Sequence, residues 1–93
     1  MTAERVQLIE SRVREALAPI HLVIEDESHL HRGHAGAREG GHFRVTVVSA
    51  AFEGRSLVEQ HRLVQDAVRG LFGTEIHALA LKTIPASRWS GAA

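Results

Sequence analysis

Residues 42–49, with the sequence HFRVTVVS, decide the fold of this chain. Apolar and polar side chains alternate along them, which is the pattern of a β-strand with one buried face. The side chains expected on the buried face are Phe43, Val45 and Val47. Residues 56–59, SLVE, then form a capping box that begins a helix, and residues 76–83, IHALALKT, predict another strand. Because a strand–helix–strand crossover joins parallel neighbours, these two strands are expected to pair in parallel.

The helix that begins after Ser56 is expected to continue to about Leu71, and Gly73 is placed to end it in a left-handed conformation. Its apolar stripe repeats at helical spacing and includes a histidine. The residues of this stripe are Leu57, His61, Val64, Val68 and Leu71. The strand that follows is nearly all apolar, so both of its faces are expected to be covered. Pro85 then starts a last short helical turn that contains Trp89.

The N-terminal part of the chain predicts a helix followed by a strand. Thr2 can cap a helix with one apolar face, and Pro19 ends that helix. The apolar face consists of Val6, Ile9, Val13 and Leu17. Residues 20–25 predict a short strand, antiparallel to residues 42–49. The polar residues 26–41 between them are expected to form a mobile loop that carries histidines.

Together these elements predict a single domain, residues 1–93, of the α+β class. The order α-β-β-α-β-α resembles a KH-like module of the second type. We expect a three-stranded mixed sheet with the two long helices packed on one face, and a frayed tail at residues 90–93.

Composition excludes several classes of protein. The chain has 93 residues, of which 44% are hydrophobic, with 11 basic and 11 acidic side chains and no cysteine. Absence of cysteine excludes a disulfide scaffold, a thiol nucleophile and a cysteine metal site supplied by this chain. Balanced charge argues against a strongly basic nucleic-acid binder. No apolar run approaches the roughly 18 residues that span a membrane, and the N-terminus has no signal-peptide pattern, so we expect no membrane association and a cytoplasmic location.

The sequence does not favour an enzyme. It contains no G-x-S-x-G elbow, no phosphate-binding G-x-x-x-x-G-K loop and no G-x-G-x-x-G fingerprint. Glu25, Asp26 and Glu27 are consecutive, so they point in different directions at the end of a strand and are expected to be solvated.

Histidine is the unusual component, with seven in the chain and four of them, His29, His31, His34 and His42, within fourteen residues. Neutral imidazole is the commonest metal ligand in proteins, but the spacing matches no closed zinc motif. His77 lies in an apolar strand, where it is either a core histidine or a ligand that faces a partner. The remaining histidines, His21, His42 and His61, are interpreted as structural.

Several segments of the chain resemble the BolA family, over nearly its whole length and in the same order. The segments that carry the resemblance are residues 26–28 (DES), the histidine loop, residues 42–49, 52–54 (FEG), 57–59 (LVE), 61–64 (HRLV), 76–83 and Trp89. The resemblance implies an α+β fold similar to the second type of KH domain. It also implies a heterodimer with a monothiol, CGFS-type glutaredoxin, and a monomer when the chain is alone.

The resemblance further implies a 2Fe–2S cluster that bridges the heterodimer, with cysteine-type ligands from the glutaredoxin and a bound glutathione, and no cofactor on the chain alone. It assigns one ligand to the histidine of the His-Ala-Leu motif, here His77. A second ligand lies in the loop between the first two strands. His31, three residues after Ser28, is the best match there, and His34 and His29 are its rivals.

The chain departs from the family pattern at two places. Gln60 stands where many members carry arginine, and residues 84–89, IPASRW, lack the acidic pair often seen before the tryptophan. Two alternatives therefore stay open. One is a DNA-binding transcriptional regulator of the BolA type, with phosphate contacts from Arg62, Arg69 and Lys82, although the G-x-x-G loop that clamps nucleotides is missing. The other is binding of a divalent metal by the loop histidines without a partner.

Overall fold

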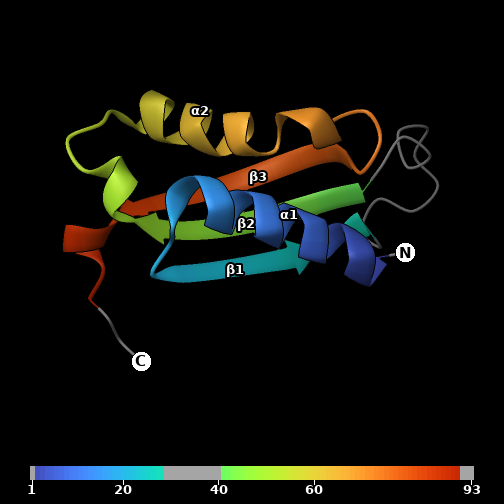
Figure 1. The fold of residues 1–93 in the computed structure, drawn as a ribbon, viewed down its shortest axis with the longest axis horizontal. Helices are drawn as coiled ribbons and strands as arrows, with labels where there is room; N and C mark the ends of the chain where they lie inside the picture. The colour runs from blue at the N-terminus through green and yellow to red at the C-terminus, as the bar shows by residue number, and fades with distance from the viewer. Residues whose placement is uncertain (1, 29–40, 91–93) are drawn as a thin grey trace.

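The computed structural model describes residues 2–28 and 41–90, and Figure 1 shows their arrangement. The helices and strands are α1 Thr2–Leu17, β1 His21–Asp26, β2 Gly41–Ser49, α2 Leu57–Ala67 and β3 Ile76–Pro85. Short 3-10 turns in the second described range, residues 41–90, are η3 Ala50–Phe52, η4 Arg69–Leu71 and η5 Ala86–Arg88. This order confirms the predicted succession of elements.

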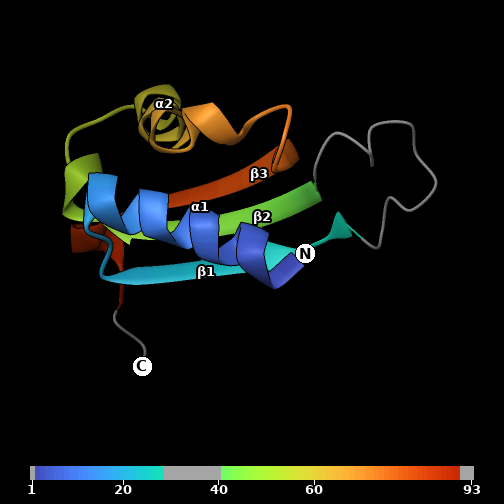
Figure 2. The same cartoon turned by 45° about the vertical axis from the view of Figure 1, so that its right-hand side comes forward.

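The three strands form one mixed sheet in the order β1-β2-β3. β1 pairs antiparallel with β2, and β2 pairs parallel with β3, as the crossover through α2 requires. Figures 1 and 2 show α1 and α2 lying along the sheet, α1 nearer β1 and α2 nearer β3. The predicted α+β architecture, with both long helices on one face, is therefore confirmed.

The core lies between the helices and the sheet. The alternation in β2 places Phe43, Val45 and Val47 on the helix-facing side, where their exposure is 2% or less. The helices contribute Ile9, Val13, Leu17 and Val64, and Val68 joins the core directly after α2. The other face of the sheet carries alternate residues of each strand and is open along much of its length (Figure 2).

The ends of the helices follow from local chemistry. The capping box of α2 is present, because the Ser56 side chain accepts from the Glu59 N–H and the Glu59 carboxylate accepts from the Ser56 N–H. α1 ends with Ala18 in the left-handed region at φ 44°, followed by Pro19. Gly73 has the predicted positive φ, at 87°.

Three expectations about α2 and β3 were wrong in detail. α2 ends at Ala67, and a separate 3-10 turn continues the chain to Leu71. Leu57 is 61% exposed and does not belong to the buried stripe, whereas Gln60 is 7% exposed and does. β3 is not covered on both faces, since the side chains that point away from α2 are exposed or half-buried.

The strands also extend further than predicted toward the histidine segment. Asp26 pairs with Phe43 in the β1–β2 ladder, and Gly41 pairs with Ile76 of β3. Both end residues of the expected loop 26–41 therefore belong to the sheet. Backbone groups next to a ladder gain hydrogen bonds when the ladder extends to include them. At the C-terminal side Ser90 is described and residues 91–93 are not. Within the described ranges, every helix is too short or too polar to cross a bilayer.

Candidate functional site

His77 owes its position to an irregularity at the start of β3. Counting back in steps of two from the buried Thr83 assigns His77 to the helix-facing side of the strand. The register with β2 shifts between Gly41 and His42, so His77 is passed over in the pairing. A bulge of this kind re-aims a side chain. Here Ile76 takes the buried position, and His77 is exposed.

The bulge brings His77 against a second histidine, His42, near the start of β2. Their ring centroids are 5.1 Å apart, with an angle of 53° between the ring planes. His42 is half-buried, and its Nε2 atom lies beneath the surface. The sequence predicts an ordinary structural role for His42, because nothing in the residue pattern marks the register shift that brings the two rings together.

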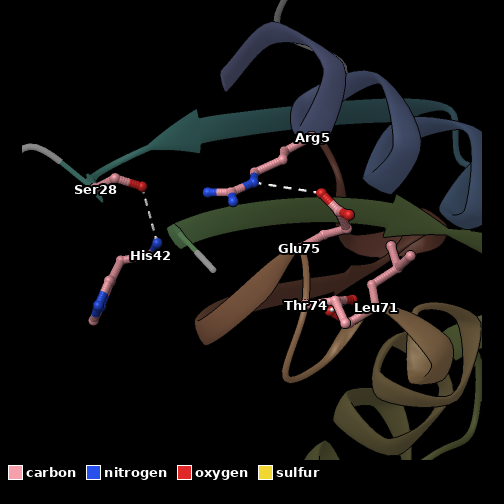
Figure 3. A network of polar contacts seen from close by, with 6 residues as sticks. All are labelled: Arg5, Ser28, His42, Leu71, Thr74 and Glu75. Carbon is pink, nitrogen blue, oxygen red and sulfur yellow. Dashed lines mark hydrogen bonds and ion pairs between the residues drawn. The ribbon is translucent and has the colours of Figure 1, made fainter. Parts of the chain in front are cut away.

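Ser28 holds the backbone of His42 in place (Figure 3). Its Oγ accepts a hydrogen bond from the His42 N–H at 3.1 Å, while its own N–H donates to Asp26 Oδ1 at 2.8 Å. The Glu27 N–H donates to the His42 carbonyl at 2.7 Å. These bonds connect the end of β1 to the start of β2. Ser28 and Gly41 are the described residues on either side of the segment that the structure does not describe.

The turn before β3 is fixed from a different side, by Glu75 (Figure 3). The Glu75 carbonyl accepts from the Gly41 N–H at 3.1 Å, and its carboxylate lies 3.4 Å from the Arg5 Nε of α1. The Glu75 N–H donates to the Leu71 carbonyl at 2.9 Å. The strand start that bears His77 is thus tied to β2, to α1 and to the end of η4.

A hollow of about 290 Å³ adjoins His42 on the open face of the sheet. Its lining consists of Glu27, His42, Phe43, Arg44, Ala78, Leu79 and Ala80. Arg44 Nε and Glu27 Oε2 form an ion pair of 3.2 Å at its edge. The small side chains of the alanines leave a shallow recess at this surface. The exposed imidazole of His77 lies beside this recess, where a second protein could reach it.

The loop histidines His29, His31 and His34 lie outside the residues that the structure describes. Within the described ranges, no three or more side chains of histidine, aspartate or glutamate are grouped so that they could hold a metal ion. The described part of the site therefore offers imidazoles from β2 and β3 without completing a coordination sphere.

The other two histidines have surroundings that fit structural roles. The His21 ring stacks on Trp89, with centroids 4.6 Å apart and an angle of 21° between the planes. This contact joins the C-terminal turn to β1 at the end of the sheet remote from His77. His61 is half-buried on α2.

The three basic residues predicted to contact phosphates are divided between two sides of the molecule. Arg62 is exposed on α2, and Arg69 follows in η4, where its guanidinium lies 2.6 Å from Asp66. Lys82 precedes Thr83, which faces α2, so the lysine lies on the opposite side of the sheet. The structure brings Arg62 and Arg69 to one side and does not bring Lys82 to them.

Comparisons with known proteins identify the family of this chain. The family model described as BolA-like protein matches residues 13–87. A bolA-like protein of Caenorhabditis elegans is 44% identical over 85 residues, covering 91% of this chain and 77% of the relative. The DNA-binding transcriptional regulator BolA of Escherichia coli is 36% identical over 83 residues, covering 89% of this chain and 77% of the relative. The structure of BolA1 from Arabidopsis thaliana superimposes with a TM-score of 0.77 at 36% identity, covering 91% of this chain and 95% of that one. The chain belongs to the BolA family.

Proposed function

We propose that this protein is a non-enzymatic partner of a monothiol, CGFS-type glutaredoxin and shares with it a bridging 2Fe–2S cluster, for iron–sulfur trafficking or iron sensing. His77 supplies one ligand from this chain. Family membership supports the proposal through the resemblance of the His-Ala-Leu motif and the histidine segment.

The exposure of His77 is the observation that carries this proposal. A histidine at an ordinary helix-facing position of β3 would pack against the aliphatic core, as the half-buried Leu79 and Leu81 do, and would be less accessible to a partner. The bulge exposes the imidazole on an edge strand instead, and hydrogen bonds on the backbone at both sides keep the strand start in one conformation. A ligand pre-positioned in this way costs less ordering when a partner binds.

The described residues fit a cluster shared with a partner protein better than a metal site that this chain would build alone. A 2Fe–2S cluster takes four ligands, and histidine can replace cysteine at some of them. This chain has no cysteine, so the thiolates would come from the glutaredoxin and its glutathione. When bound, the cluster supplies electron-transfer chemistry, and imidazole ligation raises its reduction potential relative to all-cysteine ligation.

The second ligand is proposed to be His31, with His34 and His29 as rivals. Its place three residues after Ser28 is the best match to the loop ligand of the family. Ser28 itself accepts a hydrogen bond from the N–H of His42, whose ring contacts that of His77.

Mixing the protein with a monothiol glutaredoxin, iron, sulfide and glutathione tests the proposal. We expect a visible circular dichroism spectrum distinct from that of the glutaredoxin homodimer, and we expect His77→Ala to abolish the difference. His61→Ala is the matched control and should leave the spectrum unchanged. A spectrum identical to the homodimer's, or one insensitive to His77→Ala, contradicts the proposal.

DNA binding is a second candidate function, favoured by the name of the Escherichia coli relative. Arg62 and Arg69 would supply phosphate contacts on the α2 side, where Arg62 is exposed. Genuine phosphate contacts release counterions, so affinity should fall steeply with salt, and Arg62→Gln should reduce the slope by about one. A flat salt dependence, or no effect of Arg62→Gln with Arg69→Gln, rejects this candidate.

A further inference from the structure

A second recess lies at the opposite end of β3 from His77. This open recess has a volume of about 490 Å³, within the range of small-molecule sites. Its walls come from the η3–α2 connection, the first turns of α2, the end of β3 and η5. The lining residues are Glu53, Gly54, Arg55, Leu57, Gln60, Thr83, Pro85, Ser87 and Arg88. About 26 Å of strand separates its outer end, at Pro85, from His77, given eight residues at about 3.3 Å each.

The floor of this cavity is polar, which is unusual next to an aliphatic core. Gln60 is 7% exposed and Thr83 is 9% exposed, and the Thr83 hydroxyl donates to Gln60 Oε1 at 2.7 Å. The Gln60 amide also donates to the Arg55 carbonyl at 2.9 Å. Because burying polar groups is costly unless they are hydrogen-bonded, this network fixes the amide in one orientation at the base of the cavity.

Two arginines stand at the walls. The Arg55 Nε donates to the Ala51 carbonyl at 3.1 Å. Within residues 2–28 and 41–90, neither Arg55 nor Arg88 forms an ion pair. Their guanidinium charges are therefore not neutralised by direct contact with a described carboxylate.

The carboxylate in the lining, Glu53, is already engaged. Its two oxygens accept from the Ser87 N–H at 2.7 Å and from the Ser87 hydroxyl at 2.8 Å. These bonds, with a smaller contribution from Arg88, hold the pKa of Glu53 below its usual range. Glu53 thus clamps η5 to the η3–α2 connection, and the walls carry two cations against one anion.

We propose that this cavity binds a small polar molecule through an oxyanion group, a carboxylate or a phosphate, held by Arg55 and Arg88. Guanidinium groups present paired donors that match both kinds of oxyanion. The N-terminus of α2 is not the group that binds the oxyanion in this proposal, because Ser56 and Glu59 already cap it. Polar walls select a hydrophilic ligand, and the exposed Leu57 at the rim gives its carbon skeleton an apolar contact.

Titration of the ¹⁵N-labelled protein with inorganic phosphate, and separately with succinate, tests the inference by NMR at constant ionic strength. For at least one probe we expect saturable shifts at the amides of residues 53–57 and 86–88, with a dissociation constant of about 1–10 mM. The tighter of the two probes identifies the head group. Shifts that rise linearly with both probes would overturn the proposal.

Arg88→Gln should weaken the binding at least tenfold, and Arg55→Gln should add to that loss. Arg88 has no side-chain hydrogen bond to the described residues, so its replacement should leave the folded spectrum intact. Arg12→Gln, which changes an exposed arginine of α1 outside the cavity, is the matched control and should bind as the parent does. Equal binding by the Arg88→Gln and Arg12→Gln variants contradicts the assignment.

Discussion

Single residues decide the chemistry at both ends of β3. At one end the bulge exposes His77, which strand alternation alone would have turned toward the helices. At the other end Thr83 keeps its place on the helix-facing side and meets the buried amide of Gln60. The same strand therefore presents an imidazole to the outside and a hydroxyl to the interior.

Replacing Thr83 by valine tests the buried hydrogen bond. Thr83→Val removes the donor to Gln60 Oε1 and leaves a buried acceptor without it, so we expect a loss of about 1–3 kcal/mol of unfolding free energy. Urea denaturation measures this loss. The double variant Gln60→Leu with Thr83→Val should cost less than the sum of the single changes. Strict additivity would show that the two side chains are not coupled.

Gly41→Ala tests the close packing where the chain re-enters the sheet. A Cβ at Gly41 would lie 2.6 Å from Ser28 Oγ and 2.8 Å from Phe43 Cε2. The Phe43 ring is buried and cannot move freely, so we expect about 1–3 kcal/mol of destabilisation, measured by thermal unfolding. Gly54→Ala is a poor control because its φ is +70°; Gly70→Ala, with its nearest contact at 3.9 Å, is the better one. Equal effects at positions 41 and 70 would contradict the packing argument.

At the scale of elements, the stability of α2 depends on the capping hydrogen bonds of its first turn. The Ser56 N–H donates to the Glu59 carboxylate at 2.8 Å, and the Glu59 N–H donates to Ser56 Oγ at 3.2 Å. These bonds, together with Arg55 and Arg62, hold the pKa of Glu59 below its usual range. α2 therefore starts with a cap whose strength depends on ionisation.

Glu59→Gln should make stability less dependent on pH. A carboxyl whose pKa is lower in the folded state stabilises the protein above its unfolded pKa, and this contribution is lost as the pH falls through the folded pKa. Glutamine keeps a hydrogen-bonding cap but cannot titrate. The difference between the urea midpoints at pH 7 and pH 3 should be smaller for Glu59→Gln than for the parent. For Glu15→Gln on α1 this difference should equal that of the parent. Identical pH dependence in the parent and Glu59→Gln contradicts this.

At the scale of the whole molecule, the sequence predicted more of the fold than of the site. The β2 alternation and the Ser56–Glu59 box are local patterns, and both were confirmed. The contact between His42 and His77 depends on a register shift between strands far apart in sequence, which no local pattern encodes. The sequence marks Gln60 as a departure from the family pattern, but its burial depends on Thr83 of β3, which lies far from it along the chain.

The two departures from the family pattern also meet in space. Gln60 and the turn that ends at Arg88 both line the cavity remote from His77. Because the two sites lie at opposite ends of β3, about 20 Å or more apart, their variants should act independently. Arg88→Gln should leave formation of the glutaredoxin complex unchanged, and His77→Ala should leave the phosphate and succinate titrations unchanged. Reciprocal effects would show that the two ends are coupled.

Pulsed electron paramagnetic resonance of the reduced cluster tests the central claim most directly. The protein would carry ¹⁵N-labelled histidine, and the glutaredoxin and glutathione would be unlabelled. We predict a hyperfine coupling from ¹⁵N to the cluster that is lost or reduced in His77→Ala and unchanged in His61→Ala. Absence of any ¹⁵N coupling in the parent complex, or a spectrum that His77→Ala leaves intact, would contradict the assignment of His77 as a cluster ligand.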